Sequence, residues 1–347
     1  MRIQVNARNR GFQFDAKPGE QVLYAGLAAG IDLPYECATG TCGTCKAKLV
    51  SGRVRDAWPS APGRRYVKPE QAETLMCQCI AESDLTLEVT KFVKAADPGS
   101  CRPAPGAGRL RAPRLLTHDV MAFAVDLEQP REFDAGQFMV VAAPGVEGHR
   151  AYSMVNYERG ARSLQFVAKK KPGGGFSEWL FGAAGEGAPL RVFGPLGTAT
   201  FFPGIAKDIL CIAGGSGVAG MMSILSRAAE ERYFEQHRGW LFFGVRTMRD
   251  AFFLRELSEL RGRCADRLAV TVALSDEPLA DAAAREWPRL AFAAGLVHEA
   301  ARQAMAGHYQ NVRAYVAGPP PAVDAALRVL LLEGKLTADN IRYDKFS

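Results

Sequence analysis

The pattern of hydrophobic and polar positions divides the chain into three stretches with different periodicities. The first stretch, residues 1–92, begins with alternating hydrophobic and polar positions, the pattern typical of strands. A run with helical spacing follows and ends at Gly30, a residue type that commonly terminates helices. The elements expected here are a β-hairpin over 3–14, a helix over 22–29, and strands over 45–50 and 85–89. These few strands and one helix predict a small α+β domain.

Short alternating runs punctuated by glycine and proline fill the second stretch, residues 108–203. They lie over 120–127, 137–142, 151–156, 163–168 and 190–193. Many short strands separated by turn residues are typical of a small closed antiparallel β-barrel. Before them, residues 94–108 contain three prolines and three glycines, so we expect a linker over 93–107.

Strands and helices alternate in the third stretch, residues 204–347, which predicts a parallel sheet flanked by helices. The expected strands lie over 209–213, 240–245, 268–274, 312–317 and 341–346, with helices beginning at 218 and over 252–261, 295–305 and 321–332. Ligands bind such sheets at the carboxyl ends of the strands. The chain is therefore expected to be multidomain, with an α+β domain first and an α/β domain last.

Composition and charge describe an ordinary globular chain and exclude several classes of function. Hydrophobic residues make up 48% and charged residues 23% of the 347 positions, enough to bury a sizeable core. The net charge of +6 is spread along the chain without a basic stripe interleaved with aromatics, so no nucleic-acid partner is expected. No apolar run reaches 18 residues and the first residues lack an apolar signal core, so we expect no membrane span and a cytoplasmic location.

The strongest chemical signal is a group of cysteines with the spacing C-x4-C-x2-C. Cys37, Cys42 and Cys45 form this motif, and Cys77 follows 32 positions after Cys45. Three thiolates from one loop and a fourth from a distant segment match the ligand arrangement of a plant-type [2Fe–2S] cluster. Thiolates are the soft ligands that iron–sulfur chemistry requires. These four residues are the predicted metal ligands.

Other interpretations of these cysteines remain open at this point. A structural zinc site usually has two C-x2-C pairs, whereas this chain has one such pair and a lone distal cysteine. A disulfide framework needs an oxidising compartment, which nothing at the amino-terminal end indicates. Buried thiols without a metal are the third alternative, and Cys79 competes with Cys77 for the fourth ligand position.

Two short motifs in the second stretch could bind a flat ring and a phosphate group. The residues concerned are Arg150, Tyr152 and Ser153 on a predicted strand, and Gly174, Gly175 and Ser177 at the start of a short predicted helix. The guanidinium can form a fork to a phosphate, and the phenol ring can stack on a flat ligand. Free amides at a helix start, together with a hydroxyl, make an anion site.

A glycine-rich turn follows the first strand of the third stretch. Gly214, Gly215 and Gly217 lie where the strand meets its helix, a position that can cradle a pyrophosphate. By its letters, 215–220 satisfies G-x-G-x-x-G, but the ordinary dinucleotide fingerprint also needs an acidic residue ending the second strand. That strand ends in Arg246, which could meet a 2′-phosphate, and a tight turn without a ligand remains the alternative interpretation.

Residues 1–92 resemble the plant-type ferredoxins, a family with the β-grasp fold. The resemblance lies in Pro-Tyr-Glu-Cys at 34–37 and Gly-Thr-Cys-Gly-Thr-Cys at 40–45, within the order hairpin, helix, cysteine loop and strands. It implies that the four cysteines named above hold a [2Fe–2S] cluster.

Residues 108–347 resemble the ferredoxin–NADP reductase-like flavoenzymes. The resemblance implies that Arg-x-Tyr-Ser at 150–153 binds FAD, that the residues at 174–177 support its pyrophosphate, and that 214–217 binds the nicotinamide dinucleotide. The family's Cys-Gly-x-Pro turn reads Ala317-Gly318-Pro319-Pro320 in this chain. Gly318 and Pro319 are therefore implied to lie near the nicotinamide.

Two positions depart from that family's pattern. Ala317 replaces the usual cysteine, which implies altered nicotinamide positioning or hydride-transfer rate, and Gly220 stands where proline is common. Neither removes a charged ligand, so binding is expected to survive. Residues 343–347 resemble the family's aromatic terminus, which implies that Phe346 can lie over the flavin ring. An ordinary last strand with Phe346 in the core is the alternative.

Taken as a whole, the chain resembles the NADH-oxidising electron-transfer components of bacterial oxygenases, and among them the reductases of toluene- and phenol-type diiron monooxygenases. This resemblance implies hydride transfer from NADH, rather than NADPH, to FAD. Single electrons would then pass through the [2Fe–2S] cluster to an oxygenase component or an intermediary ferredoxin. The alternatives are a reductase of a ring-hydroxylating dioxygenase or a P450 and, in a different class, an iron–sulfur sensor that binds a partner. No side chain is expected to act as acid, base or nucleophile.

Overall fold

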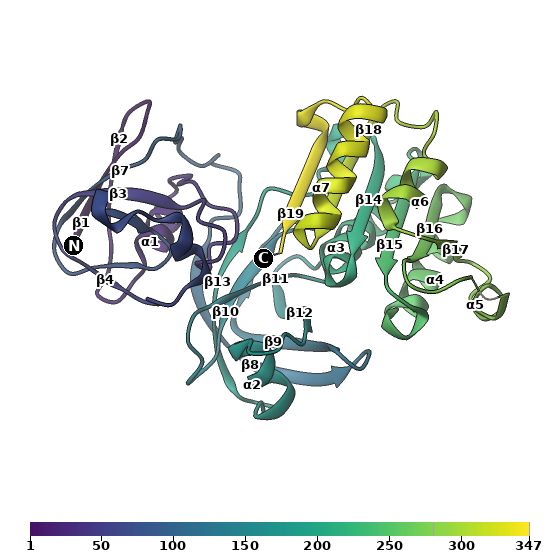
Figure 1. Ribbon diagram of the computed structural model, residues 1–347, viewed down its shortest axis with the longest axis horizontal. Coiled ribbons are helices and arrows are strands. Elements are labelled where there is room, and N and C mark those ends of the chain that lie inside the picture. Colours follow the sequence, from purple (N-terminus) through teal and green to yellow (C-terminus); the bar gives the residue numbers. More distant parts are fainter. Residues whose placement is uncertain (280, 347) are drawn as a thin grey trace. The chain divides into compact units, whose positions relative to one another are not determined.

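The chain folds into two compact units, each made of several segments. The computed structural model describes residues 1–279 and 281–346 (Figure 1). The first unit comprises Met1–Gly108, Met139–Tyr152 and Pro189–Leu196, and the second comprises Arg109–Phe138, Ser153–Ala188 and Gly197–Ser347, whose last residue lies outside the described part. The strands predicted for the barrel are therefore distributed over both units.

A five-stranded sheet with the order β2-β1-β7-β3-β5 forms the amino-terminal part of the first unit. Its strands are β1 (Arg2–Asn6), β2 (Gly11–Asp15), β3 (Lys46–Ser51), β5 (Glu73–Leu75) and β7 (Leu85–Glu88). The predicted hairpin is confirmed, because β1 pairs antiparallel with β2. On its other side, β1 pairs parallel with β7. Two short strands, β4 (Val54–Asp56) and β6 (Cys79–Ala81), pair separately.

The predicted alternation buries one face of this sheet. Ile3 and Val5 of β1 and Leu87 of β7 have 0% exposed surface. The predicted helix is also confirmed as α1 (Val22–Ala28), in which all residues except the last are buried. Because α1 is buried, its end is held in place, and the segment that contains Cys37, Cys42 and Cys45 follows it before β3.

Strands from the middle of the chain lie in both units. In the first unit, β11 (Arg150–Ser153), β10 (Phe138–Ala142) and β13 (Pro189–Leu196) are neighbours in that order. In the second unit, β9 (Val120–Arg131) pairs antiparallel with β12 (Ala161–Lys169). Strand β8 (Ala104–Leu115) lies on the other side of β9, and its residues from Arg109 on belong to this unit. A short helix, α2 (Gly175–Gly182), follows β12.

Strand β8 corrects the predicted linker, because it begins at Ala104 and not after residue 107. Its glycines and prolines indicated a linker, and only Gly108 and Leu110 of its twelve residues are buried. The hydrophobic pattern therefore contains almost no sign of this strand.

A six-stranded parallel sheet, ordered β17-β16-β15-β14-β18-β19, forms the carboxyl-terminal part of the second unit. Its strands are β14 (Asp208–Gly214), β15 (Gly239–Val245), β16 (Leu268–Leu274), β17 (Ala291–Ala294), β18 (Val312–Gly318) and β19 (Ile341–Lys345). The order reverses at β14, which is flanked by β15 on one side and β18 on the other. In such sheets, the point of reversal is where ligands bind.

Helices cover both faces of the parallel sheet (Figure 1). Helices α3 (Val218–Glu230) and α4 (Leu254–Arg263) pack on one face, where Leu225 and Leu257 are fully buried. Helices α6 (Val297–Ala304) and α7 (Pro320–Arg328) pack on the other, and a π-helical turn at Val329–Glu333 extends α7. Because both faces are covered, the strands read as continuous hydrophobic runs.

Two elements of this part were not predicted. Strand β17 has only four residues, none of them buried, and α5 (Asp281–Glu286) has six. Short, exposed elements carry too weak a hydrophobic period to be recognised.

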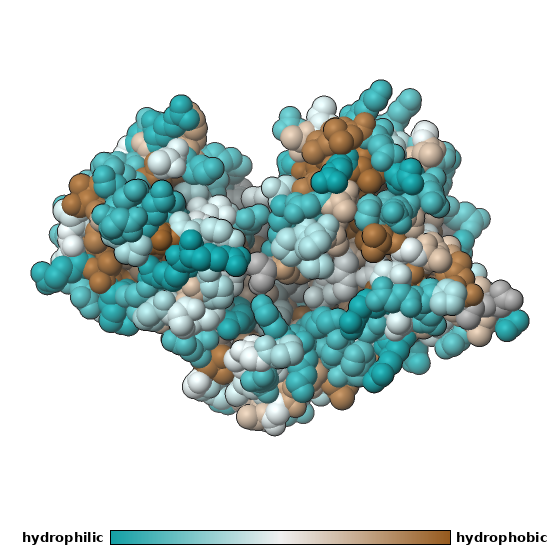
Figure 2. All heavy atoms as spheres, in the orientation of Figure 1, coloured by the Kyte–Doolittle hydropathy of each residue, from teal (hydrophilic) through white to brown (hydrophobic). Residues whose placement is uncertain are grey.

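Hydrophilic side chains dominate the face seen in Figure 2, with small hydrophobic patches between them. Among the described residues, no helix is both long enough and apolar enough to cross a membrane.

A buried cation ties the last turn of α3 to two preceding loops of the second unit. Arg227 of α3 is 8% exposed and donates hydrogen bonds to Asp134, Glu231 and the Phe201 carbonyl. Its guanidinium carbon lies 4.7 Å from the centre of the Tyr157 ring. Two of its three guanidinium nitrogens therefore have acceptors, two of which are carboxylates that compensate the burial of the charge.

We expect Arg227→Ala to lower the free energy of unfolding by about 2 kcal/mol, because it leaves the buried Phe201 carbonyl and Asp134 without their donor. Thermal unfolding of the purified protein measures this change. Arg232→Ala is the matched control, since the Arg232 side chain is 79% exposed and pairs only on the surface with Glu235. Equal losses from both substitutions would contradict the prediction.

Candidate cofactor sites

The four predicted cluster cysteines come from two loops of the first unit. Cys37, Cys42 and Cys45 lie between α1 and β3, and Cys77 lies in the turn between β5 and β6. The hydrogen-bonded pairing of β3 with β5 places the turn beside the cysteine loop. The structure therefore brings together the four residues that the sequence selected.

The four cysteine side chains form two pairs. The Cys45 and Cys77 sulfurs lie 3.2 Å apart. The Cys37 and Cys42 side chains form the second hydrogen-bonded pair. A [2Fe–2S] cluster needs two thiolates on each of its two irons. This arrangement fits that requirement, with Cys37 and Cys42 on one side and Cys45 and Cys77 on the other.

Backbone amides point at the sulfur atoms, as an anionic cluster requires. The Thr39, Thr41 and Cys42 amides each donate to the Cys37 sulfur at 3.4 Å. The Thr44 amide donates to the Cys42 sulfur at the same distance. The hydrogen bond from Cys42, followed by those from Thr41 and Thr39, lowers the pKa of Cys37 to about 4. Within this pair Cys37 is the thiolate, because the same hydrogen bond raises the pKa of Cys42, which keeps its proton.

A glycine keeps this loop compact. Gly40 has φ +85°, a left-handed conformation that side chains other than glycine disfavour. A Cβ there would also lie 2.9 Å from the side-chain nitrogen of Gln78, which itself reaches the Cys77 sulfur at 3.6 Å. The glycine thus lets the two cysteine-bearing loops approach each other.

Cys79, the competing ligand, is separated from the two thiol pairs. It lies on β6, is 1% exposed, and hydrogen-bonds Thr74. Burial raises its pKa to about 12, so its thiol stays protonated. The hydrogen bond to Cys45 and burial raise the pKa of Cys77 as well, so geometry decides between them: the Cys77 sulfur lies 3.2 Å from that of Cys45, whereas Cys79 bonds Thr74.

The predicted flavin residues of strand β11 begin in the first unit. The Arg150 guanidinium carbon lies 4.7 Å from the centre of the Trp58 ring, and one of its nitrogens donates to the His149 carbonyl at 2.8 Å. Burial lowers the pKa of Arg150 and raises that of Tyr152, which keeps the Tyr152 phenol protonated at neutral pH. Both can therefore offer donors to an anionic ligand.

The remaining predicted flavin residues lie in the second unit. The Ser177 hydroxyl donates to the Gly174 carbonyl at 3.0 Å and accepts from the Lys171 amide at 3.1 Å. It therefore holds the turn before α2 closed, and its role at an anion site stays a prediction. A Cβ at Gly174 would lie 2.7 Å from that hydroxyl, so glycine is needed there. Ser153 is buried. A Cβ at Gly220 would lie 3.5 Å from the Cβ of Ser153, so the two positions are close neighbours.

The glycine turn after β14 is pressed against the turn after β18. A Cβ at Gly217 would lie 2.3 Å from the Ala317 carbonyl oxygen, and one at Gly318 would lie 3.1 Å from the Gly214 nitrogen. Gly215 has φ +54° and nothing within 4 Å of the position of a Cβ. The two predicted dinucleotide turns therefore meet backbone to backbone, and one of them faces open space.

A cavity of about 470 Å³ lies at the carboxyl ends of the parallel strands. The predicted residues that line it are Gly214, Gly215, Pro319 and Phe346. The Phe346 amide donates to the Gly318 carbonyl at 3.0 Å, while its half-buried ring also packs on the core. Phe346 thus combines features of both predicted alternatives, core packing and a place at a ligand cavity.

Sequence reasoning missed several lining residues of this cavity, among them Lys169, Asp250 and Ser275. Asp250 supplies the carboxylate that the end of β15 lacks: it comes four residues after Arg246, in a turn capped by Thr247, whose amide and hydroxyl both donate to it. The Arg246 and Asp250 side chains lie 3.8 Å apart. The Thr-x-x-Asp spacing at 247–250 was the available signal, since it is typical of a capped turn.

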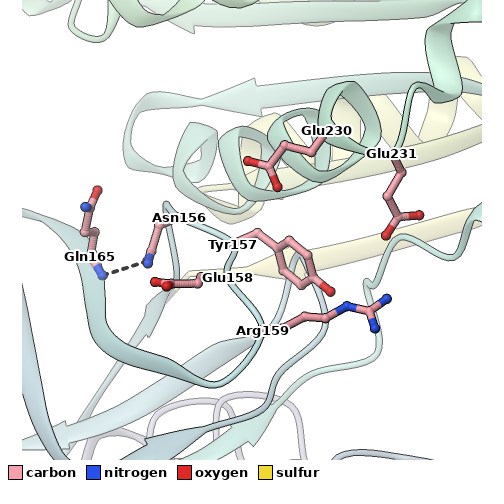
Figure 3. Close-up of a pocket in the computed structure, with 7 residues that line it drawn as sticks. All are labelled: Asn156, Tyr157, Glu158, Arg159, Gln165, Glu230 and Glu231. Carbon is pink, nitrogen blue, oxygen red and sulfur yellow. Dashed lines mark hydrogen bonds between the residues drawn. The ribbon is translucent and has the colours of Figure 1, made fainter.

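A second cavity of about 510 Å³ contains none of the predicted site residues. Glu230 and Glu231 project from the end of α3 toward the loop that carries Tyr157 and Arg159 (Figure 3). Asn156 at its edge accepts a hydrogen bond from the Gln165 amide. The carboxylates that line this cavity would repel the phosphates of a dinucleotide, so we do not assign a cofactor to it.

Comparisons with known proteins agree with this geometry. Residues 5–82 match the 2Fe-2S iron–sulfur cluster binding domains. Residues 107–201 match the oxidoreductase FAD-binding domains, and residues 211–328 match the oxidoreductase NAD-binding domains. The three cofactor-binding domains follow one another in the predicted order.

Proteins that are similar over nearly the whole chain show the family to which it belongs. The chain is 36% identical to the ferredoxin–NAD(P)⁺ reductase CarAd of Metapseudomonas resinovorans, over 94% of this chain and 95% of that protein. It is 35% identical to the ferredoxin–NAD⁺ reductase component of the alkene monooxygenase system of Xanthobacter autotrophicus, over 97% and 99%. The chain belongs to the ferredoxin–NAD(P)⁺ reductase components of multicomponent oxygenases. The reductase is also 32% identical to the xylene/toluene monooxygenase electron transfer component XylA of Pseudomonas putida, over 93% and 87%.

Solved structures give the same assignment for the reductase. The ferredoxin reductase in carbazole 1,9a-dioxygenase matches it with a TM-score of 0.81 and 32% identity, over 100% of this chain and 99% of that one. The Amycolatopsis cytochrome P450 reductase GcoB matches with a TM-score of 0.79 at 24% identity, over 99% and 98%, which shows a shared fold. The predicted resemblance to oxygenase reductases is confirmed.

We expect Cys77→Ser to remove the cluster from the reductase, because the hydroxyl is a harder and less acidic ligand than a thiolate. Iron and acid-labile sulfide in the purified protein would fall well below two of each per chain. Cys79→Ser is the matched control, two residues away and equally buried, and should keep full iron and sulfide. Loss in the control but not in Cys77→Ser would reverse the ligand assignment.

Proposed function

We propose that this reductase takes hydride from NADH onto FAD and delivers single electrons through a [2Fe–2S] cluster to an oxygenase component. The observation that carries this proposal is the presence, in one chain, of two thiol pairs wrapped by amides and a cavity at the reversal point of a parallel sheet. When bound, FAD accepts two electrons as hydride and releases them singly, which matches a one-electron cluster to a two-electron donor.

Each group of residues has a proposed task. Cys37, Cys42, Cys45 and Cys77 hold the cluster; Arg150, Tyr152, Ser153, Gly174, Gly175 and Ser177 hold FAD; and Gly214, Gly215, Gly217, Gly318 and Pro319 hold the dinucleotide. The close backbone packing of the two dinucleotide turns supports the last group, because it brings amides to the cavity without side chains in the way. The domain bounds that accompany this assignment are 1–92, 93–107, 108–203 and 204–347, with the linker shortened by the start of β8 at Ala104. Within this assignment, residues 1–92 form a β-grasp domain and residues 108–203 an antiparallel β-barrel.

The electron acceptor is proposed to be the oxygenase of a multicomponent monooxygenase acting on an aromatic or other hydrocarbon, directly or through a ferredoxin, in the cytoplasm. Relatives named for alkene and xylene/toluene monooxygenase systems support this choice. A dioxygenase is the second candidate, because the ferredoxin reductase in carbazole 1,9a-dioxygenase is similar over the full chain.

An anaerobic NADH titration tests the function. We expect NADH to bleach the flavin absorbance and to produce the electron paramagnetic resonance signal of one reduced [2Fe–2S] centre. In Cys42→Ser the flavin should still bleach, while reduction of a one-electron acceptor such as cytochrome c should fall at least about a hundredfold, as expected when a required group is removed. Flavin bleaching without a cluster signal in the unchanged protein would refute the proposal.

The reductase is proposed to prefer NADH, because the Asp250 carboxylate lines the cavity next to Arg246 and would oppose a 2′-phosphate. We expect Asp250→Asn to raise kcat/KM for NADPH relative to NADH about fivefold, the effect of removing one repulsion of about 1 kcal/mol. The amide oxygen of asparagine can still accept from Thr247, so the capped turn is retained. Arg246→Gln should move the same ratio in the opposite direction, and a ratio unaffected by either change would exclude these two residues from coenzyme selection.

A further inference from the structure

Within the first unit, a tyrosine of the ferredoxin part joins the cluster loop to the residues that precede strand β11. The Tyr24 hydroxyl, on α1, donates to the Ala38 carbonyl at 2.9 Å. Ala38 follows the cluster ligand Cys37 directly and is 1% exposed. The same hydroxyl lies 3.1 Å from Nδ1 of His149, which precedes the proposed flavin residue Arg150.

The proton inventory fixes the direction of both hydrogen bonds. A tyrosine hydroxyl has one proton, and that proton lies toward the Ala38 carbonyl. Nδ1 of His149 must therefore carry the ring proton and donate to the Tyr24 oxygen. Burial, followed by the nearby Arg191 and Arg150, lowers the pKa of His149 to about 4, so the imidazole is neutral with the proton at this nitrogen.

Packing holds the tyrosine in place. The Tyr24 ring stacks on Phe193 of β13 with 4.3 Å between ring centres and an interplanar angle of 14°. Tyr24 is 4% and Phe193 5% exposed. The stacked, buried ring therefore presents its hydroxyl to Ala38 and His149.

A second contact, between Trp58 and Arg150, joins the ferredoxin part to the same segment before β11. The indole of Trp58, which is 8% exposed, lies against the Arg150 guanidinium at 4.7 Å. Gly148 makes room for it, since a Cβ there would lie 2.5 Å from the Trp58 ring. Consecutive residues 148–150 thus contact the ferredoxin part through a glycine, an imidazole and a guanidinium.

We propose that Tyr24 and His149 are positioning residues for electron transfer, holding the cluster loop at the flavin strand through one continuous chain of bonds. The chain runs from Cys37 through the Ala38 carbonyl and the Tyr24 hydroxyl to the His149 imidazole and on to Arg150. The inference rests on the proposed function. Each passage would move one electron from reduced flavin to the oxidised cluster, which must give it to the oxygenase component before the next passage. One NADH therefore requires two passages, the proton of the reduced flavin leaves to solvent, and neither Tyr24 nor His149 gains or loses a proton.

Tyr24→Phe tests the connection, because it keeps the stacked ring and removes only the hydroxyl. In anaerobic stopped-flow mixing with NADH, the flavin-bleaching phase should keep its rate. The later cluster-reduction phase should slow about tenfold, because the substitution removes both hydrogen bonds of the hydroxyl, the one to Ala38 and the one from His149. Tyr66→Phe is the matched control, since Tyr66 is 46% exposed in the same part of the chain and should leave both phases unchanged.

His149→Phe provides an independent variant that lies outside the cluster loop and therefore serves even if Tyr24→Phe takes up less iron. If both residues act through their one shared hydrogen bond, the double variant should be no slower than the slower single variant. Independent, multiplying effects would overturn the proposal, and so would a cluster-reduction phase unchanged in both single variants.

Two measurements that do not use NADH distinguish a role in holding the cluster loop from a change in the reduction potential of the cluster. Hydrogen exchange of residues 143–150 in the oxidised protein should accelerate in Tyr24→Phe, because the contact that holds the segment is weakened. The midpoint potential of the cluster should change too little to explain the slower phase. A potential shift that accounts for the whole rate change would refute the positioning role. Failure of the unchanged protein to reduce its cluster would instead refute the proposed function.

Discussion

An anionic iron–sulfur cluster can stay inside a protein only where backbone amides replace the water around its sulfur atoms. In this chain, residues 37–45 meet that condition with amides at 3.4 Å from two cysteine sulfurs and with glycines in left-handed conformations. The rest of the amino-terminal part supports this loop: α1 fixes its beginning, β3 fixes its end, and the pairing of β3 with β5 brings Cys77 from the other side. Because the loop has no regular secondary structure of its own, its geometry depends on these neighbours.

The dinucleotide end of the molecule follows a different principle, since its geometry rests on contacts between backbones. Gly217 approaches the Ala317 carbonyl, and Gly318 approaches Gly214, without any side chain between them. This packing explains how alanine can stand at a position where related flavoenzymes usually have cysteine. The close approach that shapes the turn uses the carbonyl of residue 317, which every amino acid possesses, so the exchange leaves the cavity wall in place.

Features with a local signal were predicted well from the sequence. The cysteine spacing, the glycine turn and the alternation of strands and helices after residue 204 each lie within a short window, and the fold and family agree with them. Strand β8 was missed because its glycines and prolines resemble a linker and its core face contains a single large apolar residue, Leu110. The contact between Tyr24 and His149 joins residues 125 positions apart and depends on three-dimensional packing. No periodicity or motif of a single sequence marks such a pair.

The fit between Trp58 and Gly148 has a consequence for the exchange of parts between related proteins. Ferredoxin parts are often regarded as interchangeable cassettes that could be fused to any flavoprotein. Here the loop before β11 must leave space for the indole, because the Cβ of any side chain at residue 148 would lie 2.5 Å from the Trp58 ring. A transplanted ferredoxin part that carries this tryptophan would therefore need residues 148–150 to be transferred with it.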